Sequence, residues 1–188
     1  LLLEDWRAAY ETDPLPSTLK GVLIHTAADL SSPGPDYASG YGSIDAGRAV
    51  EFTRANTLDA LIIEGRIETP DRQDAYTLEV LPGRGDLKIT LVWDDFPADP
   101  LAAMALVNDL DLVAIDPAGR RHFPWTLDPG LPGDPARRDR EDHTNNVEQV
   151  CVADPLEGSW RIVVIGTTVP QCEQTYSLIA DGGLKIVE

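Results

Sequence analysis

Short segments of alternating apolar and polar residues fill the chain from Leu58 onward, and this pattern constrains the fold more than any other feature. Side chains of a strand alternate between its two faces, so each such segment can bury one face in a core. Turns rich in proline and glycine separate the segments, and no helical pattern intervenes. The segments are 61–63, 76–80, 87–91, 107–115, 150–152, 159–165, 175–179 and 184–187. They predict a mainly β chain, an antiparallel β-sandwich of jelly-roll type.

The preceding residues carry a helical pattern instead. Apolar residues recur at helical spacing from Leu1 to Tyr10, and the proline-rich residues 13–16 interrupt them. Ser17 is a suitable N-cap for a second helix that continues to about Ala28. A short third helix is expected after the turn at Ser43. We expect these helices to have little to pack against within this chain.

The change of pattern places a domain boundary between Phe52 and Asp59. The expected domains are residues 1–57 and 58–188. The chain has 32 acidic and 15 basic residues, which give a net charge of -17. This charge disfavours nucleic acid and anionic membranes as partners, and no apolar run approaches the length of a membrane span. We expect no nucleic acid and no membrane partner, whereas divalent cations are compatible with the charge.

Residues 107–115 combine a core-facing strand with two acidic residues. Leu110 and Leu112 are predicted to face the core, so Asp109 and Asp111 share the opposite face, with carboxylates roughly 7 Å apart after two strand rises of about 3.4 Å each. Further acids come from residues 94–95, which end the preceding strand, and from residues 142–148. Two carboxylates at ~5 Å repel by about 3 kcal/mol at an effective dielectric of 20. A cluster of this kind indicates a cation site.

Calcium suits these side chains best. It takes six to eight oxygen ligands from carboxylates, amides and carbonyls and tolerates irregular geometry, whereas zinc prefers nitrogen and sulfur. His25, His122 and His143 are dispersed in the sequence, and we expect each to be a surface or core residue rather than a ligand.

Other interpretations of these residues stay open. Asp109 and Asp111 could form the solvated face of an edge strand, where charges discourage aggregation. The pair 145–146 could be a turn capped by its own amides, and Glu148 alone would be a surface acid. The charged run 137–142 is most simply a solvated loop.

The two cysteines and the tryptophans suggest little chemistry. Cys151 and Cys172 could form a disulfide that closes a loop of about 20 residues, or remain two thiols. Trp93, Trp125 and Trp160 are expected to pack in the core or on a sheet rather than to form a sugar-stacking platform.

The helical part resembles a known family. The ordered segments Pro16 to Asp29 and Gly40 to Val50 resemble the last part of the catalytic domain of the subtilisin-like serine proteases, or subtilases, and Leu1 to Tyr10 resemble the end of the nucleophile helix that precedes it. The resemblance covers roughly residues 1–55. It implies that the β-sandwich is preceded by the last helices of a subtilase α/β domain.

The motifs that this family needs for catalysis are missing from the sequence. The serine, histidine and aspartate of a triad would require a Gly-Thr-Ser-x-x-x-Pro and a His-Gly-Thr setting, and neither occurs. We therefore assign no catalytic residue, and we predict that this chain alone is inactive.

The β part resembles the C-terminal β-domain of certain secreted bacterial subtilases. The resemblance rests on the segments 91–95, 106–112, 117–119, 142–148 and 158–162. Because those enzymes carry calcium in this domain, it implies a calcium site here. The loop from Thr126 to Asp142, rich in proline and arginine, and the additional acid Asp94 depart from the family pattern. The expected ligands are Asp95, Asp109, Asp111, Asp142, Asn145 and Glu148.

These observations favour the C-terminal portion of a secreted subtilisin-like serine endopeptidase, in which a calcium-stabilised β-domain supports the protease. The implied partners are the remainder of the catalytic domain and, through it, a protein or peptide substrate. An alternative is a calcium-dependent jelly-roll module that binds carbohydrate or protein, although a free-standing module would not need residues 1–55. A third hypothesis makes the acids catalytic, as in glycosidases, where two carboxyls ~5 to 9.5 Å apart flank the bond. It is the weakest because no substrate platform is evident.

Overall fold

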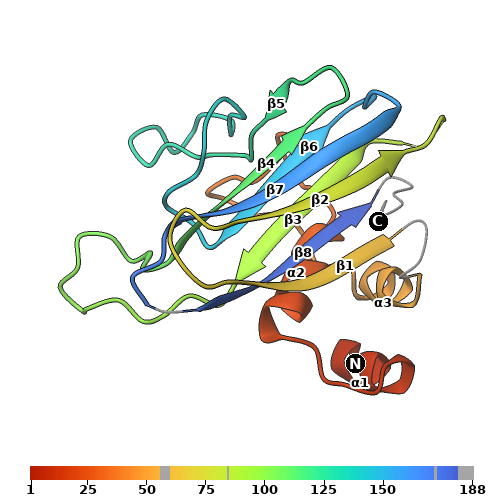
Figure 1. The fold of residues 1–188 in the computed structure, drawn as a ribbon, viewed down its shortest axis with the longest axis horizontal. Coiled ribbons are helices and arrows are strands. Elements are labelled where there is room, and N and C mark those ends of the chain that lie inside the picture. Colours follow the sequence, from red (N-terminus) through yellow and green to blue (C-terminus); the bar gives the residue numbers. More distant parts are fainter. Residues whose placement is uncertain (56–59, 84, 172, 182–188) are drawn as a thin grey trace.

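The computed structural model describes residues 1–55, 60–83, 85–171 and 173–181 (Figure 1). Within these residues the order of elements follows the prediction, with helices first and strands after. The elements are α1 (Leu2–Ala9), α2 (Pro16–His25), α3 (Ala46–Arg54), β1 (Ala60–Ile67), β2 (Gln73–Val80), β3 (Leu87–Trp93), β4 (Asp109–Ile115), β5 (Arg121–His122), β6 (Val147–Val152), β7 (Gly158–Thr168) and β8 (Gln174–Asp181).

The strands form two four-stranded antiparallel sheets packed as a sandwich (Figure 1). The order is β1-β8-β3-β6 in one sheet and β2-β7-β4-β5 in the other. The chain therefore crosses repeatedly between the sheets, as in an eight-stranded jelly roll. The predicted fold class, a mainly β chain with a jelly-roll-like sandwich, is confirmed.

One hydrophobic core fills the space between the sheets. Trp93, Trp160 and Tyr176 are the largest of its fully buried side chains. Each indole N–H finds a carbonyl, from Trp93 Nε1 to Asn108 at 2.9 Å and from Trp160 Nε1 to Leu156 at 2.7 Å. These two tryptophans are core residues, as expected, because their large apolar surfaces are buried and their polar atoms are paired.

The N-terminus of α2 differs from the prediction. Pro16 occupies the first turn of α2, so the helix begins before Ser17, and Ser17 is not its N-cap. The Ser17 hydroxyl instead lies 2.8 Å from the hydroxyl of Ser177 on β8. The third helix begins as expected after a turn, with Asp45 as the N-cap whose side chain accepts a hydrogen bond from Arg48 N at 2.9 Å.

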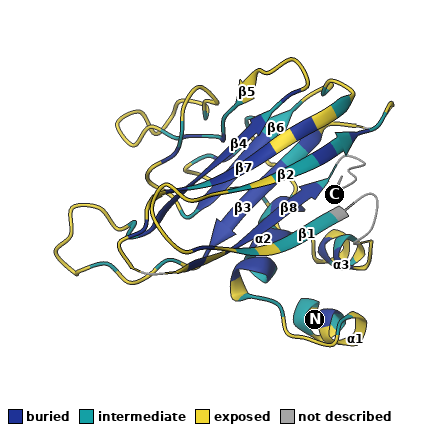
Figure 2. Ribbon diagram, in the orientation of Figure 1, coloured by how far each residue is buried: buried dark blue, intermediate teal, exposed yellow. Residues whose placement is uncertain are grey.

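α2 lies on the outer face of the β1-β8-β3-β6 sheet (Figure 1). Val22 of α2, Ala49 of α3 and Ile179 of β8 form a second, smaller core there. The approach at Gly21 is close, since a Cβ at that position would lie 2.3 Å from Ile179 Cδ1. The expectation that the helices lack a packing surface is wrong for α2. The cause is that β3 and β8 bury residues on both of their faces (Figure 2).

Several predictions fall on residues outside the described part of the chain. Residues 56–59 lie within the expected domain boundary, so the division into 1–57 and 58–188 stays a prediction. The strand expected at 184–187 and Cys172 are also outside the described residues. Cys151 has no disulfide partner among the residues that are described. No helix in the described ranges is long and apolar enough to cross a membrane.

Candidate metal site

The site is built on β4, where two faces of one strand have opposite roles. Leu110 and Leu112 are fully buried in the core, as predicted, and Asp109 and Asp111 alternate with them on the other face. Asp109 is only 9% exposed and Asp111 only 2%. Asp111 therefore does not fit the alternative of a solvated edge strand.

Glu148 reaches this strand from the opposite sheet. The short strand β5 pairs only with Ala114 and Ile115, which leaves the first half of β4 without a strand neighbour on that side. Glu148 of β6 takes this place, because its Oε2 accepts a hydrogen bond from Leu112 N at 2.6 Å. Its side chain is completely buried, so the alternative of a surface acid is wrong.

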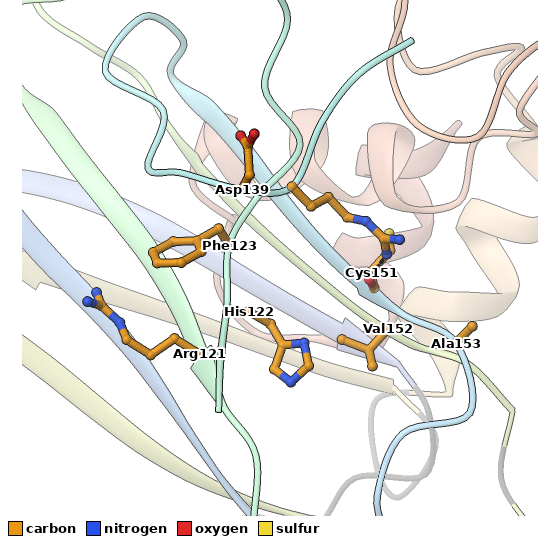
Figure 3. Close-up of a pocket in the computed structure, with 8 residues that line it drawn as sticks. Arg121, His122, Phe123, Asp139, Cys151, Val152 and Ala153 are labelled. Carbon is orange, nitrogen blue, oxygen red and sulfur yellow. Dashed lines mark hydrogen bonds between the residues drawn. The ribbon is translucent and has the colours of Figure 1, made fainter. Parts of the chain in front are cut away.

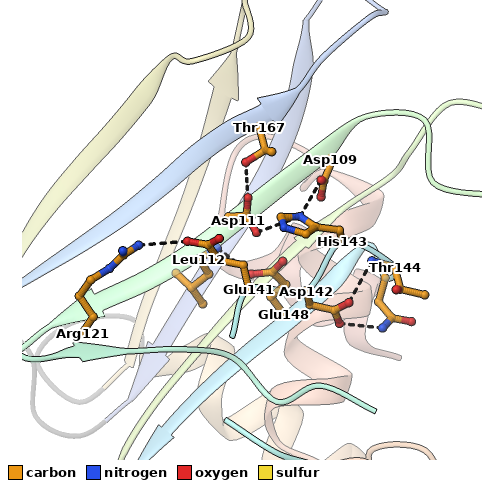
Figure 4. A network of polar contacts seen from close by, with 11 residues as sticks. Asp109, Asp111, Leu112, Arg121, Glu141, Asp142, His143, Thr144, Glu148 and Thr167 are labelled. Carbon is orange, nitrogen blue, oxygen red and sulfur yellow. Dashed lines mark hydrogen bonds and ion pairs between the residues drawn. The ribbon is translucent and has the colours of Figure 1, made fainter. Parts of the chain in front are cut away.

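His143 completes the cluster (Figure 4). Its Nδ1 lies 2.9 Å from Asp109 Oδ2 and 3.6 Å from Asp111 Oδ1. One ligand atom from each of these three residues lies within 4.8 Å of the other two. The Thr167 hydroxyl of β7 donates a hydrogen bond to the second Asp111 oxygen. Two strands, β4 and β7, and the loop before β6 thus converge on one point.

Three buried carboxylate oxygens of this group have no hydrogen-bond partner in the described part of the chain: Asp109 Oδ1, Asp111 Oδ1 and Glu148 Oε1. Buried polar atoms in native proteins are nearly always paired, because an unpaired one loses its hydration without compensation. In each carboxylate the protein holds one oxygen and leaves the other open. This arrangement is suited to a cation.

The pKa shifts of the clustered residues also favour a cation at this position. Burial raises the pKa of Asp111 to about 6, opposed by the Thr167 hydrogen bond and reinforced by the charge of Asp109. Burial and the negative charge of Asp111 raise the pKa of Glu148 well above its usual range. Burial alone would lower the pKa of His143, but the charges of Asp111 and Asp109 raise it. The site therefore favours added positive charge.

The other predicted ligands lie around this cluster rather than in it. Both Asp95 oxygens accept backbone hydrogen bonds, from Val107 N at 2.6 Å and Asn108 N at 2.8 Å. Asp142 is buried, and its Oδ2 accepts from Asn145 Nδ2 at 2.7 Å. The charge of Asp142 still reaches Glu148 and Asp109, whose pKa values it raises.

His143 is the residue that sequence reasoning missed. It was expected to be a surface or core histidine, yet it lies against both aspartates of β4. A signal was present, because His143 is part of the run 142–148 that was predicted to approach β4. The predicted ligand set takes Asp142, Asn145 and Glu148 from this run and leaves out its histidine.

A separate hollow lies between β5 and the end of β6 (Figure 3). Its volume is about 540 Å³. The Arg138 guanidinium lies 4.3 Å from the ring centre of Trp125 and donates to the Cys151 carbonyl. Arg121 pairs with Glu141 at 3.1 Å. Its arginines are therefore already engaged, and we assign no function to this hollow.

Fold and site together define a jelly-roll sandwich with a buried carboxylate and histidine cluster beside its central strand. No protein-family model matches the chain. The chain is 28% identical over 183 residues to the serine protease/ABC transporter B family protein tagA of Dictyostelium discoideum. The match covers 93% of this chain and 10% of that protein, so the chain spans about a tenth of the length of this relative. The chain is thus similar to a protein named as a serine protease, which is less specific than the subtilase family.

Solved structures resemble the chain only distantly. A Bacillus licheniformis lipase in propeptide form has a TM-score of 0.41 and 11% identity, covering 69% of this chain and 23% of its own. A mitogen derived from Yersinia pseudotuberculosis has a TM-score of 0.38 and 11% identity, covering 69% of this chain and 96% of its own. At these TM-scores and identities, neither structure indicates a function for this chain.

The raised pKa of Glu148 gives a testable pH dependence. The folded chain binds the Glu148 proton more tightly than the unfolded chain, so this stabilisation is complete at low pH and is lost as the pH rises through the folded-state pKa. Glu148→Gln stays neutral and keeps an oxygen for Leu112 N. In chelator, we expect the variant and the wild type to have similar free energies of unfolding near about pH 4. At higher pH the variant should be the more stable.

Denaturant unfolding at several pH values in chelator measures this difference. Glu141→Gln, which changes a partly exposed acid of the loop before β6, is the matched control and should show a much smaller pH trend. A difference for Glu148→Gln that stays constant with pH would contradict the assignment.

Proposed function

We propose that this chain is the C-terminal portion of a secreted subtilisin-like serine endopeptidase, with a jelly roll that stabilises the protease. The observation that carries the proposal is the similarity to a protein named as a serine protease, which extends over 93% of the chain and thus includes helices and sandwich alike. The resemblance of residues 1–55 to the end of a subtilase domain supports it. A free-standing binding module, the alternative, would need only the sandwich.

Hydrolysis in this proposal is carried by residues outside this chain. The sequence has neither of the motifs that would supply the triad serine and histidine. His25, the last residue of α2, is buried against the sheet, where its Nδ1 lies 2.8 Å from the Thr90 hydroxyl and its Nε2 lies 3.4 Å from Asp181 Oδ2. Its partners thus tie α2 to the sheet and include no nucleophile set up for attack.

The chain alone should therefore show no peptidase activity. A serine-directed phosphonate should give no adduct, as judged by the mass of the intact chain, and a general peptide substrate should remain uncleaved. Active subtilisin is the positive control. Stoichiometric labelling of one serine would overturn the proposal.

We further propose calcium as the ion of the β4 cluster. Asp109, Asp111 and Glu148 each present one open, buried oxygen, and Asp142 adds charge nearby. Calcium takes carboxylate oxygens in irregular arrangements and would cancel the repulsion among these acids. Its role would be to stabilise the sandwich, because the cluster joins β4 to β6 across the two sheets.

Two neighbouring variants test the calcium role. Leu112→Ala should cost about 2 to 5 kcal/mol with or without calcium, because a core cavity does not depend on the ion. Asp111→Asn should destabilise in calcium, by weakening ligation, and should be neutral or stabilising in chelator, where one like-charge repulsion is removed. In the wild type, calcium at a hundredfold excess over Kd adds about 2.7 kcal/mol, so chelation should lower Tm by several degrees.

Denaturant melts of both variants in calcium and in chelator measure these effects. An identical effect of Asp111→Asn in both conditions would remove Asp111 from the ligand set. Wild-type melting that is unchanged after confirmed removal of metal would refute the calcium role.

The partner we propose is the rest of the protease, and α2 offers a face for it. The side of α2 toward the sheet buries mostly small or polar residues, whereas Leu19, Leu23 and Ile24 stay only partly buried. A hollow of about 360 Å³ is lined by Leu23, Ile24 and other mainly apolar residues that include Ile44, itself 66% exposed. A cluster of partly exposed apolar side chains of this kind is a candidate surface for another part of a protein to pack on.

Ile44→Glu tests this face. The change should leave the Tm of the isolated chain nearly unchanged, since Ile44 is largely exposed there. In the full-length gene product it should lower the Tm of the protease, because a buried unpaired charge is costly. Thermal unfolding of both proteins is the measurement, and Ile44→Leu is the apolar control. An unchanged full-length protein would show that the partner lies elsewhere.

A further inference from the structure

We infer that the β4 cluster also binds zinc, through Asp109, Asp111 and Nδ1 of His143, in competition with calcium. This inference rests on the cation site proposed above and concerns the choice of ion. It follows from a feature that the calcium proposal leaves unused, the histidine nitrogen that lies against both aspartates (Figure 4).

The distances suit a small ion. Tetrahedral zinc binds nitrogen and oxygen at about 2.0 to 2.2 Å, which places neighbouring ligand atoms roughly 3.4 Å apart. His143 Nδ1 lies 2.9 Å from Asp109 Oδ2 and 3.6 Å from Asp111 Oδ1. The two separations bracket the required value. Shifts of less than about 1 Å at these atoms would meet it, and the half-exposed His143 side chain can supply them.

The ligand chemistry distinguishes the two ions. Calcium is bound by oxygen, and an imidazole nitrogen contributes little to it. Zinc takes imidazole together with carboxylates. A set of two carboxylates and one imidazole therefore favours zinc, whereas the additional oxygen of Glu148 favours calcium. His143 and Glu148 would bias the same site toward different ions.

The surrounding residues hold the aspartates as outer-shell groups do in zinc sites. The Thr167 hydroxyl donates a hydrogen bond to one oxygen of Asp111, so the other oxygen, Oδ1, stays directed at the cluster without a hydrogen-bond partner. Asp111 is only 2% exposed, so packing fixes the orientation of its side chain. Such outer contacts typically change metal affinity 10- to 100-fold when they are removed. The partly exposed His143 provides a path by which an ion can enter.

Isothermal titration with Zn²⁺ and, separately, with Ca²⁺ tests the inference. For the wild type we expect one zinc per chain, and displacement of zinc by excess calcium. His143→Gln removes the imidazole nitrogen that would bind zinc but keeps a polar side chain. Zinc affinity should therefore fall at least about tenfold while calcium affinity changes little. His122→Gln is the matched control, because His122 pairs with Asp116 away from the cluster, and it should change neither affinity. Co²⁺ in place of zinc should give visible absorption bands that His143→Gln alters.

The outcomes separate this inference from the calcium proposal. Calcium binding with no zinc binding would overturn the inference and leave the calcium site standing. Equal zinc affinity in the wild type and His143→Gln would also overturn it. Zinc binding that is lost in Cys151→Ser but kept in His143→Gln would place the ion at the thiol and overturn it as well. Zinc binding that is lost in His143→Gln and Asp111→Asn, but not in His122→Gln, would support it.

Discussion

A hydrogen bond from Leu112 N of β4 to the Glu148 carboxylate of β6 connects the two sheets, beside the part of β4 that β5 is too short to pair with. The acceptor is a completely buried acid, and two more acids lie next to it on β4. Burial of several carboxylates in one place costs free energy unless protons or a cation neutralise them. The raised pKa values of Asp111 and Glu148 are the direct expression of this cost. The proposed cation site would therefore be a consequence of how the sandwich closes at this edge.

The helices and the sandwich are connected more closely than their sequence patterns indicate. β3 and β8 are buried on both faces, by the core on one side and by α2 on the other. Close contact is possible because Gly21 has no side chain at the crossing with Ile179. The same helix keeps aliphatic side chains on its outer side, where a further partner can pack. A sandwich that carries a helix as a third layer is consistent with the supporting role proposed above.

The ion that the cluster would bind determines how the proposed support would respond to its surroundings. An all-oxygen site would respond to calcium alone, and a site that includes His143 would also respond to zinc. Both ions would neutralise the same carboxylates, so both would stabilise the closure between β4 and β6. The difference lies in one side chain on a loop, which a single substitution can remove without altering the sandwich core.

The sequence by itself determined the strands, the sandwich and the face of β4 that carries acids, because an alternation of period two is a local property that neighbouring residues reveal. It also indicated a short helix after the turn at Ser43, because a turn followed by a helix is likewise a local pattern. Tertiary structure alone decided that Glu148 is buried, that His143 meets Asp109 and that α2 covers β8. These contacts join residues 34 or more positions apart. They depend on how the two sheets close and on how short β5 is, and no local pattern records either.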